Sequence, residues 1–242
     1  MRMSLSLCMH TQHSRRHFLV ASATALAGCT TTMSPPSVPA DGFEWQPFNI
    51  PGKRATAYTR ARCGGRDAWV ARANASASLL RRRIDRPVTN TTMAEFSWWV
   101  QATIAGADLR YSETADSPVR VVFAFNGDVS RLSMRNRLQF HLAETMTGQS
   151  PPYATLMYVW DNQAALESVL QGARSDRVRK IVVEQGDGKV RQWRSYKRPL
   201  RADFQRAFGE EPGRLIGIGY LTDSDNTATQ AQACYGDVVV HA

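Results

Sequence analysis

The chain has 242 residues, of which 43% are hydrophobic and 21% are charged, and its formal net charge is +9. This length and apolar content suffice for one sizeable hydrophobic core and exclude two large domains. The basic balance leaves nucleic acid, anionic lipid and anionic polymer open as partners, and charge alone does not decide between them.

The N-terminal segment has the order of residues found in an export signal. Arg15 and Arg16 precede an uncharged run of apolar and small residues that ends at Cys29. That run is too short to span a bilayer as a mature helix. The stretch "SRRHFL" resembles a twin-arginine export signal, and "LAGC" resembles a lipobox, whose cysteine is lipidated and becomes the first mature residue. We therefore predict a signal peptide over residues 1–28 and lipidation of Cys29; the alternative is an ordinary signal with a fortuitous cysteine.

The next residues predict how the protein is held in the envelope. Residues 29–42 are small, polar and proline-rich, which is typical of a tether, here a lipidated one. Thr30 follows the cysteine in place of an aspartate, which by analogy with enterobacterial sorting favours the outer membrane. Cleavage after residue 28 would remove three arginines and no acidic residue, lowering the formal charge to +6. We expect a protein on the periplasmic side of a bacterial envelope, bound to the membrane through its lipid anchor, with no nucleic-acid partner.

From Phe43 onward the chain alternates apolar and polar residues in short runs separated by turn signals. About ten such runs favour a β-sandwich or jelly roll over a parallel α/β fold. We therefore predict a single mainly β domain over residues 43–242. The runs are "WQPFNI", "DAWVARA", "SASLLRRRI", "EFSWWVQATI", "VRVVFAF", "YATLMYVW", "VRKIVVEQ", "VRQWRSYKR", "RLIGIGYL" and "YGDVVVH".

Two stretches break this rhythm and predict short helices. Val129–Met146 spaces its leucines in a loosely helical way. Farther along, Phe204 and Phe208 lie four residues apart, and Gly209 supplies a stop signal. The expected architecture is thus a sandwich with one or two short helices.

Two cysteines fall in the folded part of the chain, Cys63 and Cys234. An oxidising compartment favours a disulfide between them, which would close a long loop and contribute roughly 4 to 5 kcal/mol by the chain-entropy model. Two separate buried thiols are the alternative, and the sequence does not choose between them.

An acidic stretch, "TDSDNTATQAQACYGD", lies close to the C-terminus. Asp223, Asp225 and Asn226 offer oxygen ligands of the kind that calcium prefers, but the stretch lacks the glycine and the distal glutamate of an EF-hand loop. Asp and Asn also cap turns through bonds to their own backbone. We expect a turn, with a calcium site at Asp223, Asp225 and Asp237 and a polar ligand contact as alternatives.

The same region carries a family resemblance. The blocks that carry it are "ASASLLRRRID", "FSWWVQ", "ADSPVRVVFAF", "MYVWDN", "RKIVVEQG", "ADFQRAFGEEPGRLIGIGYLTDSDNT" and "YGDVVV". In this order they resemble the bacterial exported proteins of the domain of unknown function 3047 family, from about Phe43 to Val240. The family has no established activity. The resemblance implies a galactose-binding-like jelly roll, in which Asp237 is similar to the aspartate that holds structural calcium in many sugar-binding modules.

Enzymatic chemistry finds few candidate residues. Nucleophilic acyl transfer needs a base beside the nucleophile, and the folded part has only His141 and His241. No GxSxG elbow and no zinc-ligand cluster are present, so we assign no catalytic residue. Glycoside cleavage needs only two facing carboxylates and remains the enzymatic alternative. Its candidates are Asp116, Asp161, Asp223, Asp225 and Glu95.

Binding of a ligand is the better supported expectation. Sugar rings stack on flat aromatic side chains, while their hydroxyl groups seek amides, carboxylates and guanidinium groups. We predict a non-catalytic binding domain for polysaccharide or another envelope component, with no cofactor apart from the calcium alternative. A glycoside-cleaving enzyme and a scaffold or assembly lipoprotein are the rivals. The ligand-binding candidates are Trp98, Trp99, Tyr158, Trp160, Asp161 and Trp193.

Overall fold

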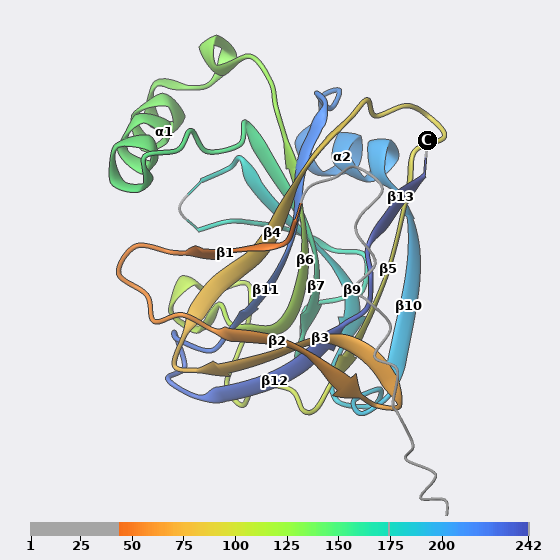
Figure 1. The fold of residues 1–242 in the computed structure, drawn as a ribbon. Coiled ribbons are helices and arrows are strands. Elements are labelled where there is room, and N and C mark those ends of the chain that lie inside the picture. Colours follow the sequence, from red (N-terminus) through yellow and green to blue (C-terminus); the bar gives the residue numbers. More distant parts are fainter. Residues whose placement is uncertain (1–43, 174, 242) are drawn as a thin grey trace, which may run out of the picture. The chain divides into compact units, whose positions relative to one another are not determined.

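The computed structural model of the protein describes residues 44–173 and 175–241 (Figure 1). The predicted signal peptide, the lipidation site at Cys29 and the tether over residues 29–42 lie outside the described residues. No helix within the described ranges is long and apolar enough to cross a membrane.

The larger of two sheets has seven strands. In spatial order these are β1 (Gln46–Asn49), β4 (Ala77–Arg86), β11 (Leu215–Asp223), β6 (Ser117–Phe125), β7 (Ala154–Asp161), β9 (Val178–Gln185) and β8 (Val169–Gln171). Neighbours are antiparallel except β7 and β9, which run parallel.

The second sheet has six strands and is antiparallel throughout. Its path runs β10 (Trp193–Pro199), β5 (Met93–Val100), β12 (Gln230–Tyr235), β3 (Arg66–Asn74) and β2 (Ala57–Cys63), and β13 (Val239–His241) pairs with β5. The predicted mainly β sandwich is therefore confirmed.

Two α-helices complete the described part. α1 (Met134–Thr147) begins where the Ser133 hydroxyl oxygen accepts from the Asn136 amide, at 3.2 Å, and ends at Gly148 in the left-handed conformation. A 3₁₀ turn at Val129–Arg131 precedes it, so the helix begins five residues after its predicted start at Val129. α2 (Leu200–Phe208) ends at Gly209, as its stop signal predicts.

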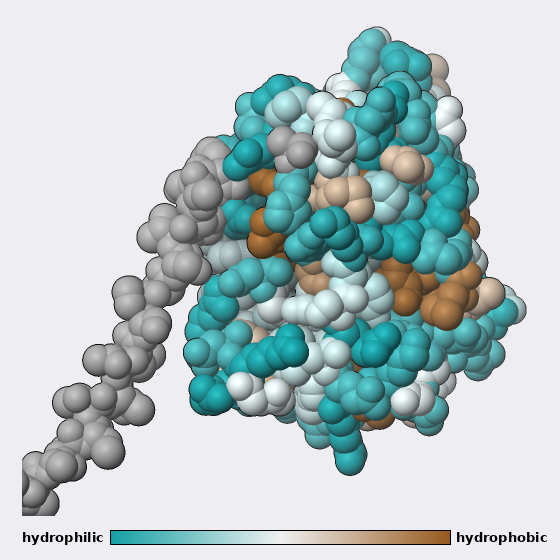
Figure 2. Space-filling view, turned by 90° about the vertical axis from the view of Figure 1, so that its right-hand side faces the viewer, coloured by the Kyte–Doolittle hydropathy of each residue, from teal (hydrophilic) through white to brown (hydrophobic). Residues whose placement is uncertain are grey.

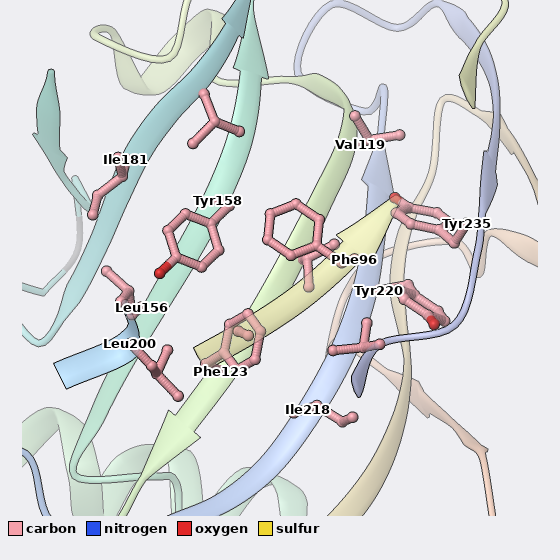
Figure 3. Packing of buried hydrophobic residues seen from close by; sticks show 14 of the residues in the cluster. Phe96, Val119, Phe123, Leu156, Tyr158, Ile181, Leu200, Ile218, Tyr220 and Tyr235 are labelled. Carbon is pink, nitrogen blue, oxygen red and sulfur yellow. The ribbon is translucent and has the colours of Figure 1, made fainter. Parts of the chain in front are cut away.

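The core lies between the inner faces of the two sheets and contains several stacked aromatic rings. Figure 3 shows Phe96 of β5 between Tyr158 and the pair Tyr220 and Tyr235. Phe96 stacks on Tyr158 with ring centroids 5.2 Å apart, and Tyr220 stacks on Tyr235 at 4.5 Å. Each fully buried large side chain contributes roughly 1.5 to 3 kcal/mol, so this aromatic layer holds the sheets together.

One strand runs through a segment that the sequence predicted as a turn. The acidic stretch begins with the end of β11 and turns over residues 224–229, but its second half, "QAQACY", is β12. β12 pairs with both β3 and β5 in the middle of its sheet. Alanine and glutamine have weak strand propensity, and burial between two partner strands overrides that preference. The strands β2 and β8 were likewise absent from the predicted runs.

Candidate ligand-binding face

Strand alternation separates the two sides of the six-stranded sheet. In β5, Phe96 and Trp98 point into the core, so Glu95, Ser97 and Trp99 point to the opposite side. The residues on that opposite side are mostly small or polar. We call this surface the outer face; it comprises Glu95, Ser97, Trp99, Trp193, Ser195, Lys197, Arg66, Arg72, Asn74, Gln230 and Gln232, with Gln101 just beyond β5.

Two indole rings stand side by side on the outer face. Trp99 and Trp193 are direct partners in the register of β5 and β10, and both are half-buried. Nε1 of Trp193 donates to the carbonyl oxygens of Cys63 and Gly64, at 3.2 and 3.1 Å. The guanidinium carbon of Arg66 lies 5.1 Å from the centroid of the Trp193 ring. The rings are thus fixed in place while part of each remains accessible.

Glycine is required at the hairpin tip that closes over these indoles. Gly64 has a φ of +52°, and a Cβ there would lie 2.8 Å from Nε1 of Trp193. A larger residue would strain the backbone and push the ring aside. The hairpin therefore depends on Gly64 to reach the indole pair.

A disulfide joins Cys63 to Cys234 beneath this hairpin, with their Cα atoms 6.5 Å apart. It confirms the bridge that the sequence left open against two free thiols. The bond connects β2 to β12 and packs with Ala68, Val70 and the indole pair in a small apolar cluster. This cluster anchors the outer face at the end where β2 turns into β3.

A hollow of about 420 Å³ lies at the other end of β12 and β3. Its size is within the range of small-molecule sites. Its lining residues are Arg72, Ala73, Asn74, Gln101, Ala102, Thr103, Gln230, Ala231 and Gln232. The register places Arg72 opposite Gln232 and Asn74 opposite Gln230, while the backbone amide of Gln101 donates to the backbone carbonyl of Gln232 at 3.1 Å. Four carboxamides and a guanidinium group therefore converge on one concavity.

The hollow and the indole pair are continuous along the strands. Gln101 follows Trp99 by two residues, and Gln232 precedes Cys234 by two, so each pair lies on the same side of its strand or strand end. Figure 2 shows the side of the molecule on which β5 and β10 lie, and most of its surface is hydrophilic with small hydrophobic areas between. Flat rings next to amide donors and acceptors are the combination that suits a polyhydroxylated ligand.

Carboxylates are scarce on this sheet. Its strands contain only Asp67 and Glu95. Glu95 accepts from Lys197 at 2.8 Å and lies 3.3 Å from Nε2 of His241, and these hydrogen bonds lower the pKa of Glu95. Glu95 is therefore an ionised partner in a surface cluster.

Three aromatic candidates lie in the core instead of on a surface. Trp98, Tyr158 and Trp160 are each fully buried. The Tyr158 hydroxyl donates to Asp203 at 2.8 Å, and Nε1 of Trp160 donates to the Gly186 carbonyl at 2.8 Å. Alternation explains the split between neighbours, because Trp98 and Trp99 point to opposite sides of β5.

Asp161 closes a turn at the end of β7. Its carboxylate accepts from the backbone amides of Leu109, Gln163 and Ala164, at 2.8, 2.7 and 2.5 Å. The side chain is therefore committed to ordering two loops, which is the ordinary role of an aspartate after a strand.

The structure brings part of the predicted calcium set together. Ligand oxygens of Asp116, Asp223 and Asp225 lie within 4.8 Å of one another. Asp237 is elsewhere, exposed and 3.2 Å from Arg60. Asp116, which the sequence considered only as a catalytic carboxylate, takes its place in the group.

Protein cations and amides already meet these three carboxylates. Nη2 of Arg120 donates to both oxygens of Asp223, at 2.8 and 2.6 Å, and Lys53 pairs with Asp225. Asp116 accepts from the backbone amides of Asn226 and Thr227, at 3.2 and 2.7 Å. The group therefore resembles an internal ion-pair network more than a metal site.

Burial raises the pKa of Asp223 to about 6, although the guanidinium of Arg120 acts in the opposite direction. At neutral pH the carboxylate is ionised and the buried pair is formed. Lys180 interacts electrostatically with Arg120 and Asp223, and burial lowers the pKa of Lys180 to about 8. Both groups face away from the sandwich core, on the outer side of the seven-stranded sheet.

The residues that line the hollow were not among the sequence candidates. Arg72, Gln101 and Gln232 are unremarkable types, and Gln232 lies in the segment predicted as a turn. A usable signal was the alternation in "QAQAC", which places two glutamines and a cysteine on one side of a strand. Only the pairing of β12 with β3 and β5 brings these amides together.

Comparison with known proteins identifies a family and a solved structure with some similarity to the chain. No curated protein sequence matches the chain. Among solved structures, the chain is similar to the xyloglucanase domain of NopAA, a type three effector from Sinorhizobium fredii, in complex with cellobiose, at 12% identity and a TM-score of 0.44. That similarity covers 83% of this chain and 94% of the other. Residues 43–239 match the model of the family described as a protein of unknown function, DUF3047, and the chain belongs to this family.

Proposed function

We propose that this protein is a lipid-anchored component of the bacterial cell envelope that binds a polysaccharide or another envelope component without cleaving it. The anchor is the lipidated Cys29, reached through a twin-arginine signal with Arg15 and Arg16, and the domain lies on the periplasmic side of the outer membrane. The ligand lies on the outer face, between the indole pair and the hollow. No cofactor is needed.

One observation carries the proposal, the convergence of Arg72 and four carboxamides in a hollow of about 420 Å³ next to Trp99 and Trp193. Carboxamides both donate and accept, as sugar hydroxyls do, and a guanidinium group adds charge-assisted donors. The indoles offer apolar faces for the rings of the ligand. A basic protein also attracts acidic polymers.

The distribution of carboxylates supports binding over cleavage. Glycoside hydrolysis needs two carboxyl groups roughly 5 to 10 Å apart across the bond that breaks. On the six-stranded sheet, Glu95 is already held by Lys197 and His241. The other candidates, Asp161, Asp223 and their neighbours, are engaged in turns and ion pairs of the seven-stranded sheet.

Binding can be tested with the full chain carrying Cys29→Ser, so that no acyl chain interferes. The measurement is retention on a glycan array and on purified cell-wall polysaccharide. We expect Arg72→Ala together with Gln232→Ala to lower retention at least about ten-fold, because each lost hydrogen bond to a charged or amide group removes roughly 1 to 3 kcal/mol. Trp99→Ala should act in the same direction.

Arg83→Ala is the matched control, because Arg83 is an exposed arginine on the other sheet. It removes the same charge and should leave retention unchanged. If no glycan or envelope fraction is retained by the parent chain, the proposal fails. If Arg83→Ala weakens retention as much as Arg72→Ala, general charge and not the outer face is responsible.

A further inference from the structure

α1 exposes a row of large apolar side chains. Met134, Leu138, Leu142 and Met146 are 77%, 70%, 57% and 60% exposed. Only three other large hydrophobic residues in the described ranges are exposed to a comparable degree, and they are scattered: Tyr111, Leu166 and Val239. Isolated exposed apolar residues are ordinary, whereas four on one helix indicate a contact surface.

The row forms one side of the helix. Its members recur every four residues, and at about 3.6 residues per turn this spacing keeps them on a slowly turning stripe. The domain is attached to the opposite side of the helix. There Asn136 is buried and its Nδ2 donates to Asp176 at 2.6 Å, and Phe140 packs against the core. The stripe therefore points away from the body, and Figure 1 shows α1 at the margin of the molecule.

Positive charge accompanies the stripe. Residues 129–148 contain three arginines, Arg131, Arg135 and Arg137, and one acidic residue, Glu144. Arg135 is exposed and falls within the arc of the stripe, close to Leu142 around the helix. Arg81 of β4 donates to Gln149, directly after the helix, and adds a further cation at this end of the molecule.

We propose that the exposed side of α1 docks on an anionic membrane surface. Arginines beside an apolar stripe can pair with lipid phosphates while the apolar side chains enter the boundary of the acyl chains. A second copy of the chain is the other conceivable occupant. It fits less well, since it would bring two arginine-rich surfaces together around one acidic residue each. The inference concerns a different element from the outer face and stands whether or not that face binds a glycan.

Vesicle binding tests this contact in the full chain with Cys29→Ser. Vesicles of equal parts phosphatidylglycerol and phosphatidylcholine are compared with vesicles of phosphatidylcholine alone, by co-sedimentation. Residues 1–43 are identical in all variants, so differences between variants report on α1. We expect Leu138→Gln together with Leu142→Gln to lower partitioning onto the anionic vesicles at least ten-fold. Arg135→Gln together with Arg137→Gln should remove most of the preference for anionic over neutral vesicles.

Leu166→Gln is the matched control, because Leu166 is 50% exposed and lies outside the helix. Its partitioning should stay within two-fold of the parent chain, and circular dichroism should show that all variants remain folded. Equal partitioning of the parent and the Leu138→Gln, Leu142→Gln chain would overturn the proposal. So would a dimer in sedimentation velocity that the same pair of substitutions abolishes without changing vesicle binding, because the occupant would then be a second copy.

Discussion

The outer sides of the two sheets both carry polar residues, but the two sets are arranged in opposite ways. On the seven-stranded sheet, Arg120, Lys180 and Asp223 are buried next to an apolar cluster that includes Leu109 and Ala164 from neighbouring loops. On the six-stranded sheet, Arg72, Gln230 and Gln232 line an open hollow. In the first set, Arg120 and Asp223 are hydrogen-bonded to each other within the chain, whereas the second set still has donors and acceptors to offer.

The functional groups that are most conspicuous in the sequence are therefore not the ones that are free to contact a ligand. The aspartates near the C-terminus are the most noticeable functional groups in the sequence, yet Asp223 is covered and bound to Arg120 by two hydrogen bonds. The amides of the outer face draw no attention in the sequence. A buried, internally paired carboxylate stabilises loops, and an exposed carboxamide beside an indole can meet a ligand.

Breaking the buried ion-pair network of Arg120 and Asp223, here called the covered network, should have the largest effect on stability. We expect Arg120→Ala to lower the free energy of unfolding by about 3 to 5 kcal/mol, because it leaves Asp223 buried without its cation. Urea unfolding at pH 7 measures the loss. Arg214→Ala is the matched control, since Arg214 pairs with Asp85 at 2.6 Å on the exposed surface. That change should leave the free energy of unfolding nearly unchanged. Similar losses in both variants would show that the covered network has no special role.

Lys180 tests the same network from the other side. It lies opposite Met157 of β7 and Leu170 of β8, both members of the apolar cluster on that side. Burial lowers its pKa to about 8 from 10.5, so the unfolded chain binds a proton between these pH values that the folded chain releases. Stability should therefore rise with pH from about 8 to 10.5, by up to about 3 kcal/mol.

Replacing this lysine by methionine should remove the pH-dependent part. We expect Lys180→Met to raise the free energy of unfolding at pH 7 by about 1 to 3 kcal/mol and to flatten the rise above pH 8. Thermal unfolding from pH 7 to 10.5 measures both effects. Lys197→Met is a suitable control, because Lys197 is an exposed lysine whose partner, Glu95, is also partly exposed. A less stable Lys180→Met chain would mean that the ammonium group is stabilised by its surroundings.

Much of the fold was predictable because period-two alternation is local. The runs around Phe96, Phe123 and Tyr158 each became a strand, and Gly209 ended α2 as expected. β12 was missed because its alanines and glutamines carry little strand propensity, and its place was decided by partners more than a hundred residues away. The local sequence pattern predicts a strand only where the side chains themselves favour the strand conformation.

The candidate site was less predictable for the same reason. Alternation shows that Trp98 and Trp99 point to opposite sides, but only the assembled sandwich shows that Trp99 faces outward. The hollow forms where β3, β12 and the end of β5 meet, so its residues come from three distant segments. The pairing of Cys63 with Cys234 was an open alternative, since spacing does not determine a disulfide.

The smallest effect is expected from calcium. About 1 mM calcium, at which extracellular calcium modules are typically loaded, should leave the thermal midpoint of the protein unchanged. An ion entering between Asp116, Asp223 and Asp225 would have to displace Lys53 and to lie next to the guanidinium of Arg120. A calcium-dependent rise in the midpoint that disappears in Asp225→Ala would show that the network opens to admit the ion. The outer side of the seven-stranded sheet would then also accept a ligand, and it would no longer differ in this respect from the outer face of the six-stranded sheet.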